Sequence, residues 1–532
     1  RGLVRREFLR PAPARLPAEA GRSGRLSNVG LPEKEGHQFR HLLVRDAVYA
    51  AVPKQARVEL HERLAGLLEA RAGARVREYE EIVGYHLEQA WRFLAELGPI
   101  DRRGRELGAR ATGRLAAAGR RALGRGDTPA ATALLDRALA LLPGDDPLRG
   151  HLLNDLAESL VAAGDFGRAA EVLTAATVAA EAAPDRALLA QVAVGRLGMR
   201  LLTEPGLPLD TIQGEVGAAI DALDQAGDDR GLARAWRLLG YESFMRCRIE
   251  QAEEALARTI AHARRAGDER VDAYARGMLA AAAFWGPLPV PDGADRCRRL
   301  LAETVGNRYV EGSVLHVLGA LAAMRGRFEQ ARDLVDQGTE VAATLGRLRL
   351  AAIWSQFAAT VELLAGRPEA AEERLQRGYR ALERMGETGA RSNLAADLAH
   401  ALVAGGRHDE ARRFADLSRA LAAREDVYAQ VRWRAATARA LAADGDPGRA
   451  AGLAREAVEL AEVTDMLNLR ADAWLDLAAT AELAGRPEKA AAAAASGLAL
   501  YERKGNQVAA AAVRARLGLA APPQAGGGRE AG

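Results

Sequence analysis

The segment GRPEAAEERLQRG at residues 366–378 decides the fold, because its pattern recurs along the chain. Gly366 lies five residues before Ala371, Leu375 follows four residues later, and the small residue Gly378 comes three residues after that. The same pattern begins at Gly126, Gly164, Gly326, Gly406, Gly445 and Gly485. From position 331 to 490 the central alanines are 40, 40, 39 and 40 residues apart. A register kept over four intervals indicates a repeated structural unit.

The pattern predicts a helical hairpin. The glycine takes a left-handed conformation that lets the chain reverse, and the polar residue after it, such as Asp127 or Arg367, helps to start the second helix. The alanine and the small residue seven positions later share one helical face, so the two backbones approach closely. A further copy around Ala252 has Cys247 in place of the glycine.

The composition favours helices throughout. Apolar residues make up 49% of the chain but aromatic residues only 5%, and Ala and Leu dominate. A closed helical bundle would show the same apolar faces. The fixed Gly-to-Ala spacing favours an all-α, right-handed superhelix of antiparallel hairpins instead.

First helices of the hairpins resemble the tetratricopeptide family. Trp236, Leu239 and Gly240 match the Trp-x2-Leu-Gly part of its signature, and Trp474 and Leu477 match it again. The resemblance covers repeats at 105–505 and implies a binding scaffold. Residues 185–226 and 268–305 have the right length but match poorly, and Pro287, Pro289 and Pro291 are expected to break the second of these into a loop. We expect a capping helix at 506–519 and a disordered tail at 520–532.

The N-terminal part resembles a different kind of segment. Residues 39–49, 81–90 and 118–123 are similar to the junction in large bacterial regulators where a STAND-like P-loop ATPase passes through a winged helix into tetratricopeptide repeats. This resemblance implies the end of a winged helix with a Pro/Gly/Arg-rich loop at 1–60, and a helical connector at 61–104. Such regulators carry an adenylate/guanylate cyclase domain, the closer likeness here, or a LuxR-type DNA-binding domain.

No catalytic machinery is visible in the sequence. It lacks GxxxxGK[ST] and any Gly-Lys pair, so we expect no cofactor here and ATP only in a missing N-terminal part of the parent. The first residue is Arg1, which suggests an excerpt. The net charge of +3 argues against a nucleic-acid partner, and the lack of an apolar run of about 20 residues argues against a membrane partner. The two isolated cysteines favour the cytoplasm.

Isolated polar residues have simpler explanations than catalysis. His37 and His41 have a metal-ligand spacing only on a helix, whereas the alternation of Phe39, Leu42 and Val44 predicts a strand. Tyr85 and His86 are better explained by a packed helix face. The arginines of the first 25 residues could contact nucleic acid through a wing, but no base-reading pattern accompanies them, which favours a solvated loop or an interdomain contact.

Groove-facing positions of the first helices are the candidate binding site. Counting from the motifs gives Arg234, Arg237, Tyr241, Phe244, His316, Gln356, Asn393, His400, Arg432 and Arg439. We expect a protein or peptide ligand in this groove, with a small-molecule effector as an alternative, and an upstream ATPase module in cis. Ordinary packing explains the same residues equally well. Replacing Arg234, Arg237 and Tyr241 together by Ala is expected to abolish binding without loss of stability.

Overall fold

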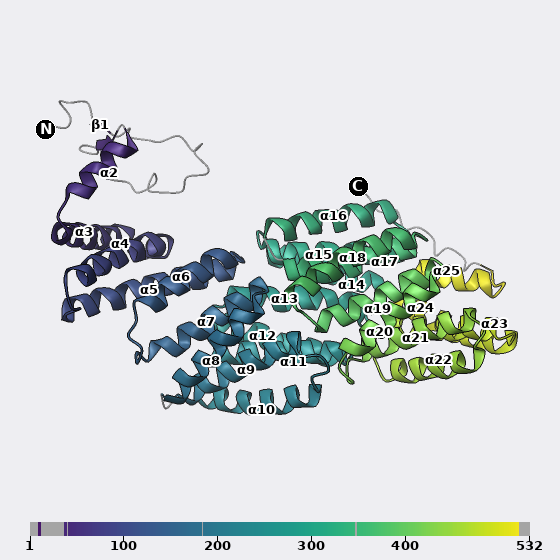
Figure 1. The fold of residues 1–532 in the computed structure, drawn as a ribbon. Coiled ribbons are helices and arrows are strands. Elements are labelled where there is room, and N and C mark those ends of the chain that lie inside the picture. Colours follow the sequence, from purple (N-terminus) through teal and green to yellow (C-terminus); the bar gives the residue numbers. More distant parts are fainter. Residues whose placement is uncertain (1–8, 12–36, 40, 183–184, 346–347, 521–532) are drawn as a thin grey trace. The chain divides into compact units, whose positions relative to one another are not determined.

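The computed structural model describes residues 9–11, 37–39, 41–182, 185–345 and 348–520. These residues are almost entirely helical and belong to two compact units, 1–115 and 116–532 (Figure 1). None of the described helices combines the length and the apolar character needed to cross a membrane.

The first unit begins with a short antiparallel strand pair, β1 (Leu9–Pro11) and β2 (His37–Phe39). Its helices are α2 (Leu42–Ala51), α3 (Lys54–Ala72), the short η1 (Gly73–Arg75), α4 (Val76–Leu97) and the first part of α5 (Arg102–Arg125). The strand predicted through Val44 is wrong beyond Phe39, because the chain turns into α2 at Leu42 and none of the residues of α2 is buried. A strand there would need a pairing partner longer than the three residues of β1. Most of the predicted winged-helix loop lies outside the described residues.

The core of the first unit lies between α3, α4 and α5. Val58, Val83 and Leu87 are completely buried. Gly84 allows close approach, since a Cβ there would lie 3.0 Å from the side chain of Leu115.

The second unit is a series of antiparallel helix pairs. Its first helices are α5, α7 (Leu148–Ala163), α9 (Arg186–Thr203), α11 (Asp229–Met245), α13 (Glu269–Trp285), α15 (Arg308–Met324), α17 (Leu348–Leu364), α19 (Gly389–Ala404), α21 (Val427–Ala443) and α23 (Leu467–Leu483). Its second helices are α6 (Thr128–Ala140), α8 (Phe166–Ala182), α10 (Leu209–Gln225), α12 (Ile249–Ala266), α14 (Val290–Glu303), α16 (Phe328–Thr344), α18 (Pro368–Met385), α20 (His408–Leu421), α22 (Pro447–Glu462) and α24 (Pro487–Lys504). Helix α25 (Gln507–Arg516) follows and packs on α24.

The predicted all-α hairpin architecture of tetratricopeptide type is confirmed. All seven motif glycines lie in the turn of a hairpin with φ between 69° and 87°. Cys247 occupies the equivalent turn with φ 56°, and among the described residues it is the one non-glycine with positive φ. The side chain is completely buried, so its packing offsets the backbone strain of this conformation.

Small residues let the paired helices approach, as predicted. The motif alanines are buried at every repeat. A Cβ on Gly378 would lie 2.6 Å from the carbonyl oxygen of Ala352 on the partner helix. The prediction that the residue after the glycine starts the second helix holds for aspartate: Asp127 accepts a hydrogen bond from the Ala130 amide at 3.1 Å. Arginine at this place, as in Arg367, makes no side-chain cap.

The poorly matching segments also form hairpins. The loop expected at the prolines is confirmed for Pro287 and Pro289, which lie between α13 and α14, but is wrong for Pro291. Helix α13 ends at Trp285 and α14 begins at Val290, with Pro291 in its first turn. Proline is tolerated there because the first amides of a helix have no intrahelical acceptor.

Successive turns of the superhelix touch one another. Helix α7 contacts α17, α9 contacts α19 and α15 contacts α25, each pair ten helices apart along the chain. The Thr388 amide donates to the carbonyl oxygen of Leu202 at 2.7 Å. The carboxylate of Asp465 accepts from the amides of Ile249 and Glu250 at 2.9 and 2.8 Å, at the start of α12. About five hairpins therefore complete one turn and enclose the space inside it.

Candidate functional site

A cavity of about 180 Å³ lies inside the first superhelical turn. Residues of α7, α9, α11, α13, α15 and α17 line it, together with Leu173 of α8. It is thus surrounded by the first helices of six consecutive hairpins. Contact between α7 and α17 closes this ring.

One part of the wall is apolar and comes mostly from α7 and α9. Small residues on these helices, Ala157, Gly195 and Gly198, leave the space open. A Cβ on Gly198 would meet nothing nearer than the Leu238 side chain at 4.0 Å. The remaining apolar lining residues are Val161, Ala162, Leu173, Val194, Met199, Leu202, Leu238 and Leu350.

The other part of the wall is basic and aromatic. The acidic and basic residues that line the cavity are Arg234, Arg237, Arg270, Arg349 and Glu158. Four guanidinium groups therefore face one carboxylate. Three tyrosines from three successive first helices, Tyr241, Tyr274 and Tyr309, complete this side.

Three of the four arginines are held by carboxylates. Arg234 and Arg270 both pair with Glu158, and Arg234 also lies 3.5 Å from Asp155. Arg349 pairs with Glu387 at 3.3 Å. These pairs link helices from different repeats, so they fix the wall of the cavity. Removing one partner of such a buried pair is strongly destabilising.

Arg237 differs from the other three. Within the described ranges no carboxylate lies in ion-pair distance of its guanidinium, whereas each of the other three has one. Its Nε has no hydrogen-bond acceptor, a property that it shares with Nε of Arg234 and of Arg349. Its contact is with the ring of Tyr274, whose centroid lies 5.3 Å from the guanidinium carbon. Burial lowers the pKa of Arg237, and the neighbouring charge of Arg234 acts in the same direction. Arg237 is only partly buried, yet a partly desolvated charge without a counter-ion is still costly, which marks this position as a place for an anion.

The tyrosine hydroxyls add donors to the cavity. Burial raises the pKa of Tyr241, so its hydroxyl stays protonated at neutral pH. Tyr241 lies four residues after Arg237, on the same face of α11. A phenol hydroxyl both donates and accepts hydrogen bonds, so this wall can contact a polar ligand group at several points.

The structure brings three predicted site residues together at this cavity: Arg234, Arg237 and Tyr241. Phe244, predicted for the same cluster, packs instead against an apolar cluster that includes Cys247 and Tyr428. Arg234 is buried and ion-paired with Glu158, which indicates a structural role, so we now expect its replacement by Ala to lower stability as well as binding.

His316 is a buried packing residue. It is 2% exposed, its Nδ1 lies 2.8 Å from the Gly312 carbonyl oxygen, and its ring lies 4.6 Å from the ring of Trp354. Burial lowers its pKa to about 4, so the ring is neutral. Asn393 is partly buried beside Ser392, whose hydroxyl lies 3.5 Å from its side-chain oxygen.

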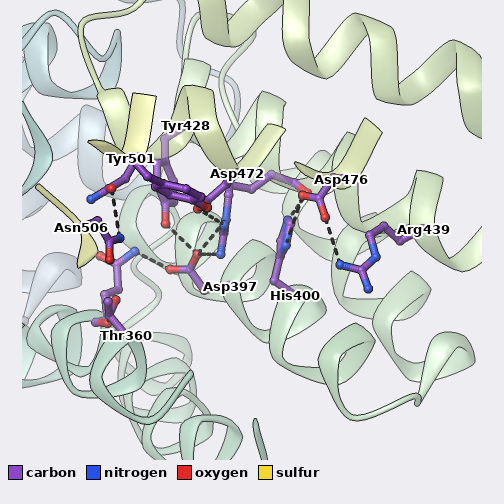
Figure 2. A network of polar contacts seen from close by, with 12 residues as sticks. Thr360, Asp397, His400, Tyr428, Arg439, Asp472, Asp476, Tyr501 and Asn506 are labelled. Carbon is purple, nitrogen blue, oxygen red and sulfur yellow. Dashed lines mark hydrogen bonds and ion pairs between the residues drawn. The ribbon is translucent and has the colours of Figure 1, made fainter. Parts of the chain in front are cut away.

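The four remaining predicted residues belong to an internal polar network between later repeats (Figure 2). Asp397 accepts from Gln356 at 2.7 Å and from Arg432 at 3.2 Å. His400 lies 2.9 Å from the Arg432 carbonyl oxygen, and Arg439 pairs with Asp476 at 3.2 Å.

This network binds α17, α19, α21, α23 and α24 to one another. Tyr428 also donates to Asp397 at 2.7 Å, and Asp472 accepts from Tyr501. Burial raises the pKa of Asp472 to about 6 and lowers that of His400 to about 4. Because the predicted residues here have partners inside the protein, packing explains them better than ligand binding does.

Arginines also gather around a larger hollow of about 820 Å³ at α20, α21 and α22. Arg434 lies over the Trp433 ring at 4.2 Å and pairs with Glu456 at 3.1 Å. Arg412 pairs with Asp409 and Asp444. Arg419 and Arg424 also line the hollow and have no ion pair among the described residues, but both side chains are exposed to solvent. Water can solvate these exposed charges, so the hollow is a weaker candidate than the first cavity.

Of the residues singled out in the first unit, His86 is buried and contacts the buried His61, whereas His41 is exposed. The Nδ1 atoms of His61 and His86 lie 2.8 Å apart, and Tyr49 lies 2.7 Å from Nε2 of His61. Burial lowers the pKa of His86 to about 4. Tyr85 is 43% exposed, and its ring packs edge-on against those of His61 and His86, so its packed role is confirmed in part. A search of the described residues finds no group of three or more His, Cys, Asp or Glu placed to hold a metal ion.

Sequence reasoning missed Glu158, Arg270, Tyr274, Tyr309 and Arg349. Tyr274 comes six residues after Asp268, which caps α13, and Arg234 comes six residues after Asp228, which caps α11. Counting from the capping aspartate would therefore have predicted Tyr274 as a cavity residue.

No family model matches the sequence, and no curated protein is similar to it at a significant level. Solved structures show remote likenesses. A Rap protein complexed with competence and sporulation factor is 12% identical, with a TM-score of 0.43 over 70% of this chain and 99% of that one. Yeast Tom70 is 13% identical, with a TM-score of 0.31 over 85% and 96% of the two chains.

Proposed function

We propose that this chain is a non-catalytic scaffold that binds a ligand inside the first turn of its superhelix. The observation that supports the proposal is the cavity, which is open in the centre of a closed ring of six first helices and carries one unpaired guanidinium, that of Arg237. All six hairpins line the same cavity, so a ligand bound there changes the packing of all six together.

The ligand is a protein or peptide segment that inserts one group, or a small effector. Its binding stiffens the first turn and is transmitted along the array, because each repeat contacts its neighbours and the next turn. A cytoplasmic location and the lack of a bound cofactor in this chain are part of the same proposal.

The proposed parent is a multidomain bacterial signalling ATPase, with a cyclase-linked form favoured over a LuxR-type regulator as the alternative. Its support is the sequence likeness of residues 39–49 and 81–90 to the junction of such proteins. Sequencing the gene on both sides of this segment decides between the two. Calorimetry with Mg-ATP tests the expectation that this chain alone binds no nucleotide, and micromolar binding contradicts it.

The cavity itself is tested by filling it. Gly198→Leu places a side chain in the open space, and the matched control Gly214→Leu places the same side chain on the exposed face of α10. Both replace glycine inside a helix, so both gain similar helix propensity. A library of small aromatic and aliphatic compounds, screened by ligand-observed NMR, is expected to give hits on the wild type and Gly214→Leu that are lost on Gly198→Leu. Hits that persist on Gly198→Leu contradict the proposed site.

A further inference from the structure

We infer that the ligand of this cavity carries a carboxylate on a small apolar group, and that Arg237 is the residue that binds the carboxylate. The inference rests on the proposed function and deepens it. The cavity offers one free positive charge beside an apolar wall, which is the complement of such a group.

The pairing of the arginines selects Arg237. Arg234 and Arg270 share Glu158, and Arg349 has Glu387, so these guanidinium groups already have counter-ions. The charge of Asp268 acts to raise the pKa of Arg237, but Asp268 caps α13 at the Val271 amide and lies 3.7 Å from Arg230. A ligand carboxylate is therefore the missing partner. Guanidinium binds carboxylate through two parallel hydrogen bonds, which also orients the ligand.

Tyr274 and Tyr241 fit this role. The Tyr274 ring lies against the guanidinium and limits its freedom, so the fork is held in place before the ligand arrives. Tyr241 stands one helical turn further along α11 and can donate its hydroxyl hydrogen to the same carboxylate.

The size of the cavity limits the apolar part. Its volume of about 180 Å³ resembles that of engineered apolar cavities of ~150 Å³ that bind benzene. A single phenyl or short branched alkyl group fits, whereas a folded segment does not. The wall that would receive this group consists of small and aliphatic residues from α7 and α9, including Val161, Val194 and Met199.

The same chemistry occurs in a free organic acid and in the carboxyl-terminal apolar residue of a peptide. Benzoate and benzamide, which have nearly the same shape, serve as the charged and neutral probes of the first source. Gly-Gly-Phe and its carboxyl-terminal amide serve for the second. Binding is measured by titration calorimetry on the full chain and checked by saturation-transfer NMR.

The wild type is expected to bind the acid of at least one pair tenfold or more tightly than its amide. In Arg237→Met, which keeps an apolar side chain against Tyr274, the acid is expected to bind no better than the amide. Arg237→Lys should recover part of the preference. The variant Gly198→Leu should bind none of the four probes, and Gly214→Leu should bind them as the wild type does. Preference within the benzoate pair assigns a free acid, and preference within the peptide pair alone assigns a chain terminus.

Stability provides a second readout. Arg237→Met removes a partly buried charge without breaking an ion pair, so its melting temperature is expected to equal or exceed that of the wild type. If Arg237 has a structural role, Arg237→Met should melt at a lower temperature than the wild type. That result would overturn the inference. Equal affinity for acid and amide in the wild type, or an acid preference that survives in Arg237→Met, also overturns it while leaving the proposed function intact. If none of the probes and none of the library compounds binds the wild type, the proposed function itself fails.

Discussion

Replacing Lys504 by Met should loosen the contact between the two turns of the superhelix. Lys504 is the last residue of α24 and is completely buried. Its ammonium donates to the carbonyl oxygens of Ala283, Gly286 and Leu288 at 3.0, 2.6 and 2.8 Å. These carbonyls lie at and just beyond the end of α13, where the last carbonyls of a helix lack intrahelical partners. A cation there also complements the helix dipole.

The three hydrogen bonds set the magnitude. Each buried carbonyl left without a donor costs about 1–3 kcal/mol, and loss of the buried charge returns several kcal/mol of desolvation. We expect a net loss of about 3 kcal/mol. Lys489→Met is the matched control, because Lys489 is exposed on the same helix and its replacement should change stability by less than about 0.5 kcal/mol.

The effect should depend on pH. Burial lowers the pKa of Lys504 to about 7, below its usual 10.5. The unfolded chain then binds more protons than the folded one between pH 7 and pH 10.5, so this lysine makes the wild type more stable as the pH rises through that window. At pH 9 the folded side chain is a neutral amine, which donates two of the three hydrogen bonds and carries no buried charge, so the loss caused by Lys504→Met should be larger at pH 9 than at pH 6.

Equilibrium urea unfolding at both pH values measures the loss, and hydrogen exchange locates it. Exchange should accelerate at the end of α13 and in α24, and remain unchanged in α7 and α9. A loss below about 1 kcal/mol at pH 9, or one equal to that of Lys489→Met, refutes the idea that this lysine joins the turns.

Three further changes test other parts of the fold. Acidification from pH 6.5 to pH 4 should destabilise the first unit, because burial lowers the pKa of His86 to about 4 and the unfolded chain therefore takes up the proton first. Hydrogen exchange in α3 and α4 should become faster on acidification, and this acceleration should be smaller in His86→Leu. Asp397→Ala should lower the free energy of unfolding in urea by about 3–5 kcal/mol, because it removes a counter-ion of the buried Arg432, whereas Asp409→Ala at an exposed pair should change it by less than about 0.5 kcal/mol. Cys247→Gly should melt higher than Cys247→Ala by the equivalent of about 1 kcal/mol, because of the positive φ; the opposite order excludes strain at this turn.

The repeated hairpin could be predicted because its rules are local. A glycine at positive φ, an alanine five residues later and a small residue seven beyond that determine one pair of helices without reference to the rest of the chain. The same rules put Arg234, Arg237 and Tyr241 on the inner face of α11, and the structure places them at the cavity.

The closure of the ring could not be predicted in this way. Contact between α7 and α17, or between Thr388 and Leu202, depends on small rotations summed over about five hairpins. A change of a few degrees per repeat would separate the turns, and no single motif encodes that angle. For the same reason Arg349, which reaches the cavity from α17, had no signal at sequence level.

The roles of the arginines depend on this closure. On the sequence alone Arg234 and Arg237 are equivalent, since both are groove-facing positions of one helix three residues apart. Two carboxylates of α7, those of Asp155 and Glu158, distinguish them, because both pair with Arg234 and neither pairs with Arg237. Replacing both would mix a loss of folding with a loss of binding. Replacing Arg237 alone separates the two effects. If Arg237 serves ligand binding, its replacement should weaken binding without lowering the stability of the fold.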